Sequence, residues 1–143
     1  MGFFDSLFGN GGRGLTLEDM ELGSFQSIAA KDEKVVWEGS VNFLGQDVSL
    51  VMSGDETNLN EAEKKSLDEI IKNEADIESQ IDQGLAEAFD NADKEYSKWR
   101  DHFNFISIST NHGIEITFEE KESRYLFDVH FEDNKFGGLS ING

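Results

Sequence analysis

The chain has 143 residues, of which thirty are Asp or Glu and twelve are Lys or Arg, so its formal net charge is −18. Such a charge repels nucleic acid and anionic membrane surfaces and attracts basic proteins and cations. The absence of Cys excludes disulfides, thiolate metal sites and thiol nucleophiles. No apolar run approaches the roughly 20 residues of a membrane span, and we expect a cytoplasmic protein whose single domain covers residues 15–143.

The first fourteen residues form a separate N-terminal segment. Phe3, Phe4, Leu7 and Phe8 have the spacing of one face of a short amphipathic helix. The Gly-rich run that follows, to residue 14, indicates a hinge. Two interpretations stay open: the segment docks on the body of the protein, or it is an apolar tag for a partner or a membrane surface.

Alternating apolar and polar residues predict strands in the first third of the domain. Residues 24–30 form a weak first edge strand. A β-hairpin follows over residues 34–52. Its apolar positions are Val35, Trp37, Val41, Phe43, Val48, Leu50 and Met52.

A helical stretch is expected from about Asn60 to Trp99, with Thr57 or Asn58 as its N-cap. Its apolar stripes join imperfectly at residues 72–74, so we expect a break there between a helix of about 12 residues and one of about 25. Gly84 lies in the middle of the second helix, where glycine costs stability. A close backbone approach to the sheet would explain it.

The second helix carries the only long acidic run without a base. Seven acids lie in this run: Glu74, Asp76, Glu78, Asp82, Glu87, Asp90 and Asp93. Uncompensated like charges on one helix are destabilising, and there are more of them here than solubility needs. We interpret the polar face of this helix as a docking surface for a basic partner, with a solvated face as the alternative.

The last third of the chain predicts an antiparallel β-meander, because short turns separate its strand-like segments. These are 103–110, which is apolar on both faces, and then 114–119, 125–132 and 139–141. Strands therefore do not alternate with helices. We expect an α+β fold in which a single antiparallel sheet of five or six strands, the N-terminal hairpin plus the C-terminal meander, carries the two central helices on one face. The expected inward residues of the sheet are Val35, Trp37, Val41, Val48, Leu50, Ile114, Ile116, Phe118, Phe127 and Val129. They face Ile81, Leu85, Phe89 and Tyr96.

The sequence holds no recognisable catalytic, metal or cofactor motif. The HExxH, GxSxG, Walker and GxGxxG patterns are all absent. His102, His112 and His130 lack metal-ligand spacing, and the acids around Asp128 and Glu132 do not fit a calcium loop. We expect no enzyme activity, no cofactor and no metal. Without a basic patch we also expect no nucleic-acid binding.

Three short stretches carry a resemblance to a family. They are Trp37-Glu38-Gly39-Ser40-Val41, the acidic helical middle, and the closing Phe131-Glu132-Asp133-Asn134-Lys135-Phe136-Gly137-Gly138-Leu139-Ser140-Ile141-Asn142-Gly143. Over about residues 30–143 the chain resembles a family of small acidic bacterial proteins with no agreed activity. The resemblance implies no catalytic residues and is compatible with a role as an immunity protein for a secreted toxin.

The leading functional hypothesis is a non-enzymatic binding protein, immunity-like or inhibitory, that contacts a basic protein through the acidic helix. Three alternatives stay open. The first is a DNA mimic whose carboxylates imitate phosphates. The second is a ligand or enzyme domain with a helix–sheet pocket near Trp37, Tyr96, Trp99 and His102. In the third, the charge serves only solubility or salt adaptation. The sequence indicates no oligomeric state.

Overall fold

The computed structural model describes residues 14–143. Four strands come first: β1 (Thr16–Asp19), β2 (Gly23–Lys31), β3 (Lys34–Phe43) and β4 (Gln46–Gly54). Three helices follow: α2 (Glu61–Lys72), α3 (Glu74–Asn91) and the short α4 (Trp99–His102). Four strands complete the chain: β5 (Phe103–Ser109), β6 (Ile114–Glu120), β7 (Leu126–Glu132) and β8 (Lys135–Asn142). The amphipathic segment and hinge expected over residues 1–14 lie outside the described residues except for Gly14.

The fold is α+β with one sheet, as expected, but the sheet has eight strands rather than five or six. They are arranged in sequence order from β1 to β8, and every neighbouring pair is antiparallel except β4 and β5, which pair in parallel from Ser49–Val51 to Ser107–Ser109. The expectation of a purely antiparallel sheet was therefore also wrong. The polar β1 and the Gly-containing β8 give little strand signal on their own, and each is completed by pairing with its neighbour.

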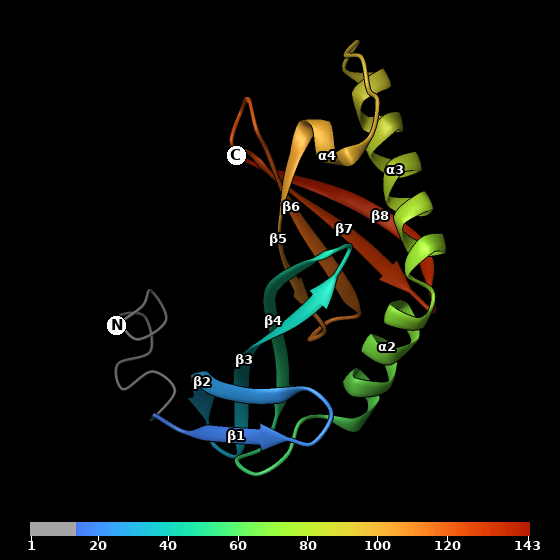
Figure 1. The fold of residues 1–143 in the computed structure, drawn as a ribbon. Coiled ribbons are helices and arrows are strands. Elements are labelled where there is room, and N and C mark those ends of the chain that lie inside the picture. Colours follow the sequence, from blue (N-terminus) through green and yellow to red (C-terminus); the bar gives the residue numbers. More distant parts are fainter. Residues whose placement is uncertain (1–13) are drawn as a thin grey trace.

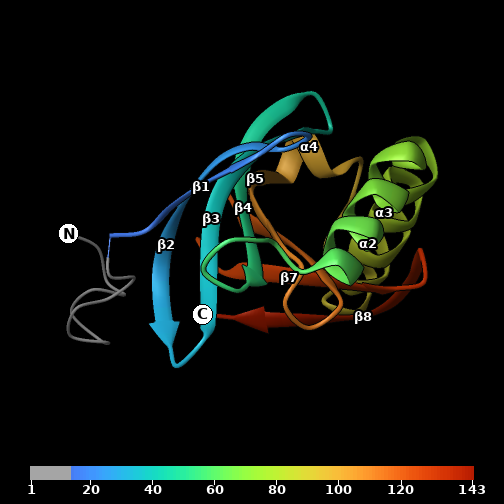
Figure 2. The same ribbon diagram turned by 90° about the horizontal axis from the view of Figure 1, so that it is seen from below.

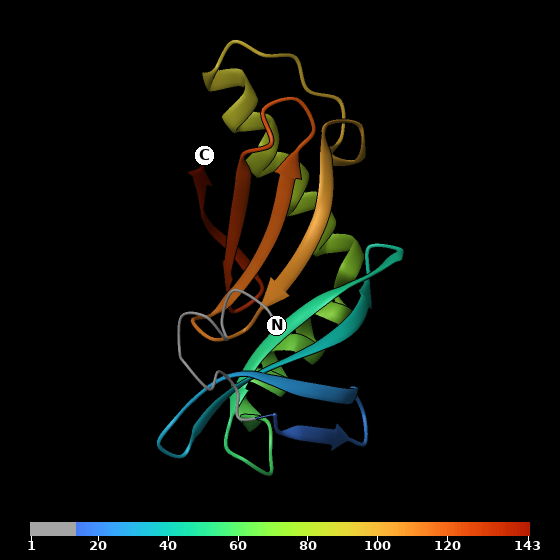
Figure 3. The same ribbon diagram turned by 90° about the vertical axis from the view of Figure 1, so that its left-hand side faces the viewer.

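The sheet falls into two four-stranded halves that occupy opposite ends of the molecule (Figures 1 and 3). The short parallel β4–β5 contact joins the halves. Helices α2 and α3 lie on one side of the curved sheet and run along both halves (Figures 1 and 2). The carboxyl ends of β4 and β5 meet at one edge of the joint, next to the start of α2.

The core confirms the predicted inward faces. All ten expected sheet positions are buried, and so are Ile81, Leu85 and Phe89, while Tyr96 is partly buried. Burial along β6 alternates strictly between buried and intermediate, which is the period of a strand with one covered face. The apolar area removed from water on this one side is the main stabilising contribution to the fold.

The predicted break between the helices is confirmed at Asn73, which ends α2 and precedes α3. The predicted N-cap was wrong by two or three residues. Asn60 caps α2, and its side chain accepts a hydrogen bond from Glu63 N. Thr57 and Asn58 instead donate to the Asp55 carboxylate.

The second helix was expected to continue to Trp99, but α3 ends at Asn91. Asp93 takes a left-handed conformation with φ 57°. The N–H groups of Asp93 and Lys94 donate to the carbonyls of Asp90 and Phe89, which is the hydrogen-bond pattern of a Schellman motif. The chain then reverses toward the sheet, so residues beyond Asp93 still pack on the apolar side without being helical.

Gly84 is buried at a close approach, as its position in the helix indicated. The approaching group is the ring of Phe136 from β8, and a Cβ on Gly84 would lie 2.7 Å from that ring. The side chain of Gln80, one turn earlier, accepts from Phe136 N at 2.7 Å and donates to Asn134 O at 3.0 Å. The glycine and the glutamine together fix α3 against the outer strand of the sheet.

Within residues 14–143, none of the helices has the length and apolar character needed to cross a membrane.

Candidate functional site

The seven acids of the acidic run do not form one surface. Glu74, Glu78 and Asp82, at four-residue steps on α3, accept hydrogen bonds from other parts of the protein. Glu74 accepts from Leu44 N at 2.7 Å, in the β3–β4 turn. Glu78 accepts from the indole N–H of Trp99 at 2.8 Å, and the Arg100 guanidinium lies 3.8 Å from it.

Asp82 accepts two hydrogen bonds through one oxygen. Its Oδ1 accepts from the Tyr96 hydroxyl at 2.5 Å and from Trp99 N at 2.8 Å. Burial and this carboxylate raise the pKa of Tyr96 well above its ordinary value, because both disfavour the phenolate. The carboxylates of Glu78 and Asp82 thus hold the segment from Tyr96 to Trp99 against α3. This segment lies beyond the end of α3, so the backbone hydrogen bonds of that helix do not hold it there. We refer to Glu74, Glu78 and Asp82 as the structural acids.

The other four acids of the run face away from these contacts. Asp76 accepts only from the neighbouring Gln80 side chain. Glu87 and Asp90 on α3, and Asp93 just beyond it, are exposed and make no side-chain hydrogen bond or ion pair with any described residue. We call Glu87, Asp90 and Asp93 the free acids.

The free acids lie where the helix disfavours negative charge. The C-terminal end of a helix carries a partial negative charge, which acids there oppose. The last turn of α3 has no basic side chain to offset them. Lys94, the next base along the chain, is paired at 2.6 Å with Glu120, which is 5 % exposed. The free acids therefore do not stabilise the fold and are available to solvent.

The four residues proposed for a helix–sheet pocket do not gather around one cavity. Trp37 is buried in the other half of the sheet, and its indole donates to Asp55 O at 3.0 Å. Trp99 is buried against Phe105 and Phe118. Tyr96 stacks on His102, and His102 lines a hollow of about 380 Å³ between the α3 end and the β6–β7 turn.

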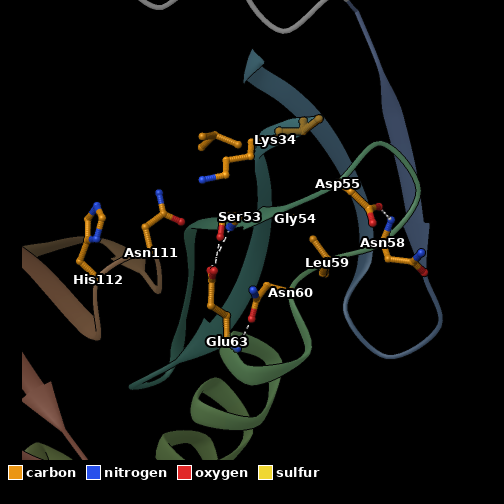
Figure 4. A pocket seen from close by; sticks show the side chains of 12 residues that line it. Lys34, Ser53, Gly54, Asp55, Asn58, Leu59, Asn60, Glu63, Asn111 and His112 are labelled. Atoms are coloured by element: carbon orange, nitrogen blue, oxygen red, sulfur yellow. Dashed lines mark hydrogen bonds between the residues drawn. The ribbon is translucent and has the colours of Figure 1, made fainter. Parts of the chain in front are cut away.

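A larger cavity, of about 610 Å³, lies at the joint between the two halves of the sheet (Figure 4). We call it the joint cavity. Its lining comes from the start of β3, the end of β4 with the loop to α2, the first turn of α2, and the β5–β6 turn. Its polar lining includes Lys34, Ser53, Asp55, Glu63, Asn111 and His112.

Sequence reasoning missed the joint cavity because its parts are far apart in the chain. Glu63 accepts from Ser53 N at 2.9 Å and from the hydroxyl groups of Ser53 and Thr110, and Thr110 lies 47 residues away. Only the parallel pairing of β4 with β5 brings these segments together. The only local sequence feature that pointed to this cavity was the pair of lysines, Lys31 and Lys34, on either side of the β2–β3 turn.

The three histidines lie apart from one another. His130 is 3.3 Å from Glu132 on the outer face of β7, His112 is exposed in the β5–β6 turn, and His102 accepts from Ser97 N at 3.2 Å. Across residues 14–143 there is no group of three or more His, Cys, Asp or Glu side chains that could hold a metal ion.

Comparison with protein-family models, with curated proteins and with solved structures gave no match to this chain. The resemblance drawn from the short sequence motifs therefore stays a prediction, and functional arguments rest on the geometry described above.

Proposed function

We propose that this chain is a non-enzymatic protein that binds a basic protein partner through the free acids at the end of α3. The observation that carries the proposal is the position of Glu87, Asp90 and Asp93. They are exposed, unpaired within the described part of the chain, and placed at the helix end where they lower stability. Charges that cost stability and form no internal contact are available for an intermolecular one.

The proposed mode of binding is electrostatic. Complementary charge at the rim of an interface speeds association and makes it sensitive to salt. An immunity-like or inhibitory role toward a basic protein, in the cytoplasm, is the form of this function that we put forward.

The internal contacts of the structural acids weigh against the DNA-mimic alternative. A mimic needs a continuous row of carboxylates along the helix at phosphate-like spacing. Glu74, Glu78 and Asp82 are occupied by internal donors, which leaves the middle of that row unavailable.

The test is a comparison of two triple variants with the same change in charge. The first neutralises the free acids: Glu87→Gln, Asp90→Asn and Asp93→Asn. The control neutralises exposed or half-exposed acids elsewhere, in the β2–β3 turn and on β6: Asp32→Asn, Glu33→Gln and Glu115→Gln. Partners are recovered by crosslinking at low salt, purified, and titrated against each variant.

We expect the first variant to weaken binding of the recovered basic partner at least tenfold, and the control to leave it within about twofold. Affinity of the unmodified chain should fall as salt rises. Recovery of no basic partner at low salt, or equal weakening by both triple variants, would contradict the proposal.

A further inference from the structure

The joint cavity contains two carboxylates, and the protein already supplies donors to both. Asp55 accepts from the backbone N–H groups of Thr57 and Asn58, which hold the pKa of Asp55 below its ordinary value. Glu63 accepts three hydrogen bonds, two from Ser53 and one from Thr110. These acids shape the cavity wall, and each already accepts hydrogen bonds from the protein.

Lys34 differs from these two acids because no described residue binds its charged group. Its ammonium points into the cavity (Figure 4), and among residues 14–143 it has no ion pair and no hydrogen bond. Its cross-strand partner is Lys31, and like charges placed directly opposite one another are destabilising. Lys31 lines an adjoining hollow of about 810 Å³ that shares Lys34, Gly54 and Asp55 with the joint cavity. In a chain with thirty acids, two neighbouring lysines that lack an acidic partner among the described residues indicate a site for an anionic group.

Asn111 supplies the second polar feature. Its Oδ1 is buried and accepts no hydrogen bond from any described residue. A buried acceptor without a donor costs free energy. Asn111 and His112 both come from the β5–β6 turn and lie on the side of the cavity away from Asp55 and Asn58 (Figure 4). A ligand that donates a hydrogen bond to Asn111 would remove this cost.

The third feature is apolar. Val35 and Leu59 are buried, at 0 % and 4 % exposed, and form part of the cavity wall together with Val36. A volume of about 610 Å³ lies within the range of pockets that enclose small molecules, roughly 300–1,000 Å³.

We propose that the joint cavity binds a small zwitterion with an aliphatic side chain, which is the chemistry of a free aliphatic amino acid. The ligand carboxylate pairs with Lys34, the Asn111 amide turns so that its Oδ1 accepts from the ligand ammonium, and the ligand side chain lies against Val36 and Leu59. The nearby Glu63 favours the ammonium and disfavours a doubly charged anion such as phosphate. This site is separate from the free acids, so ligand binding here does not depend on the proposed binding of a basic partner.

The experiment is an NMR titration of the full chain in which backbone amide signals of Gly54, Asn111 and His112 are followed. The probes are L-leucine, L-valine and glycine, and two half-molecules, propionate and ethylammonium. Inorganic phosphate is added as a separate probe. All are used up to millimolar concentration, because small ligands of this size bind in the micromolar-to-millimolar range.

Two matched pairs of variants locate the site. Lys34→Met removes the cavity charge. Lys65→Met removes an exposed lysine on α2 that has no ion pair with residues 14–143. Asn111→Ala removes the unpaired acceptor, and Asn104→Ala removes an exposed asparagine on β5. Removing a buried acceptor that has no donor also removes its desolvation cost, so Asn111→Ala should weaken binding without lowering the free energy of unfolding.

We expect L-leucine to shift the cavity signals, to bind severalfold more tightly than glycine, and to bind at least tenfold more tightly than either half-molecule. Lys34→Met should weaken L-leucine binding about tenfold, since it removes a charge-assisted contact, and both control variants should bind normally. The proposal is overturned if no amino acid moves these signals, if phosphate or propionate binds as tightly as L-leucine, or if Lys65→Met weakens binding as much as Lys34→Met. Loss of stability with unchanged binding in Asn111→Ala would also overturn it.

Discussion

The change Asp82→Ala tests whether the structural acids hold the fold together. The Asp82 carboxylate accepts from Trp99 N at 2.8 Å and from the Tyr96 hydroxyl at 2.5 Å. A hydrogen bond to a charged group contributes about 1.5–3 kcal/mol. The hydroxyl of the partly buried Tyr96 can regain a water partner, so only part of its bond is lost. We expect Asp82→Ala to lower the free energy of unfolding by about 2–4 kcal/mol.

Asp90→Ala is the matched control, because it removes the same charge from the same helix. Asp90 is exposed and has no side-chain contact with the described residues. Its removal also relieves an unfavourable charge near the helix C-terminus, so stability should change by less than about 0.5 kcal/mol or rise slightly. Urea unfolding followed by tryptophan fluorescence gives both values without the charge screening that guanidinium chloride adds. Equal losses in the two variants would refute the division into structural and free acids.

Three further changes test the ends and contacts of α3. Asp93→Gly should raise the free energy of unfolding by about 0.5–1 kcal/mol, because Asp93 has φ 57° and glycine takes that conformation without strain; a loss in urea unfolding would contradict this. Gly84→Ala should lower it by about 1–3 kcal/mol through the contact with Phe136, and adding Phe136→Leu should recover part of the loss. Lys94→Met should lower it by about 1–3 kcal/mol at pH 7, because it leaves the buried Glu120 carboxylate without its cation.

The Lys94→Met result has a defined pH dependence. Burial raises the pKa of Glu120, but hydrogen bonds from Lys94 and Ser123 outweigh burial and hold it below the ordinary 4.5. A depressed pKa gives stability that is present above the ordinary value and is lost as pH falls through the folded value. The difference in free energy of unfolding between the unmodified chain and Lys94→Met should therefore become smaller below about pH 4.5. If this difference stays constant from pH 7 to pH 3, the ion pair between Lys94 and Glu120 is not the cause of the lost stability.

The sequence predicts the parts of this fold that depend on periodicity. The break at residues 72–74 and the inward faces of the strands follow from apolar spacing, because burial on one side imposes that spacing directly. The same dependence on apolar spacing caused the wrong prediction of where α3 ends. Tyr96 and Trp99 keep the helical spacing because they pack on the same side after the chain has reversed at Asp93.

Features that depend on pairing between distant segments were not predictable. The parallel contact between β4 and β5 involves three residues of each strand, too few to impose a pattern on either. The structural acids are distinguished from the free acids only by their partners, and Leu44 lies 30 residues from Glu74. In sequence all seven acids look alike, so the interpretation as one docking surface was the natural one.

Net charge is consequently a poor guide to what this protein can recognise, and the donors around each carboxylate are a better one. Asp55 and Glu63 line the same cavity as Lys34 and accept from backbone or hydroxyl donors, while Lys34 has no ion pair among residues 14–143. Asp82 also accepts from internal donors, whereas the Asp90 side chain accepts from none of the residues that the structure describes. A charge of −18 attracts any basic molecule to the surface, but only carboxylates without internal donors can exchange water for a partner's ammonium or guanidinium groups at no cost to the fold. By that criterion the acidic contact surface lies at the end of α3, and the cationic one lies at Lys34.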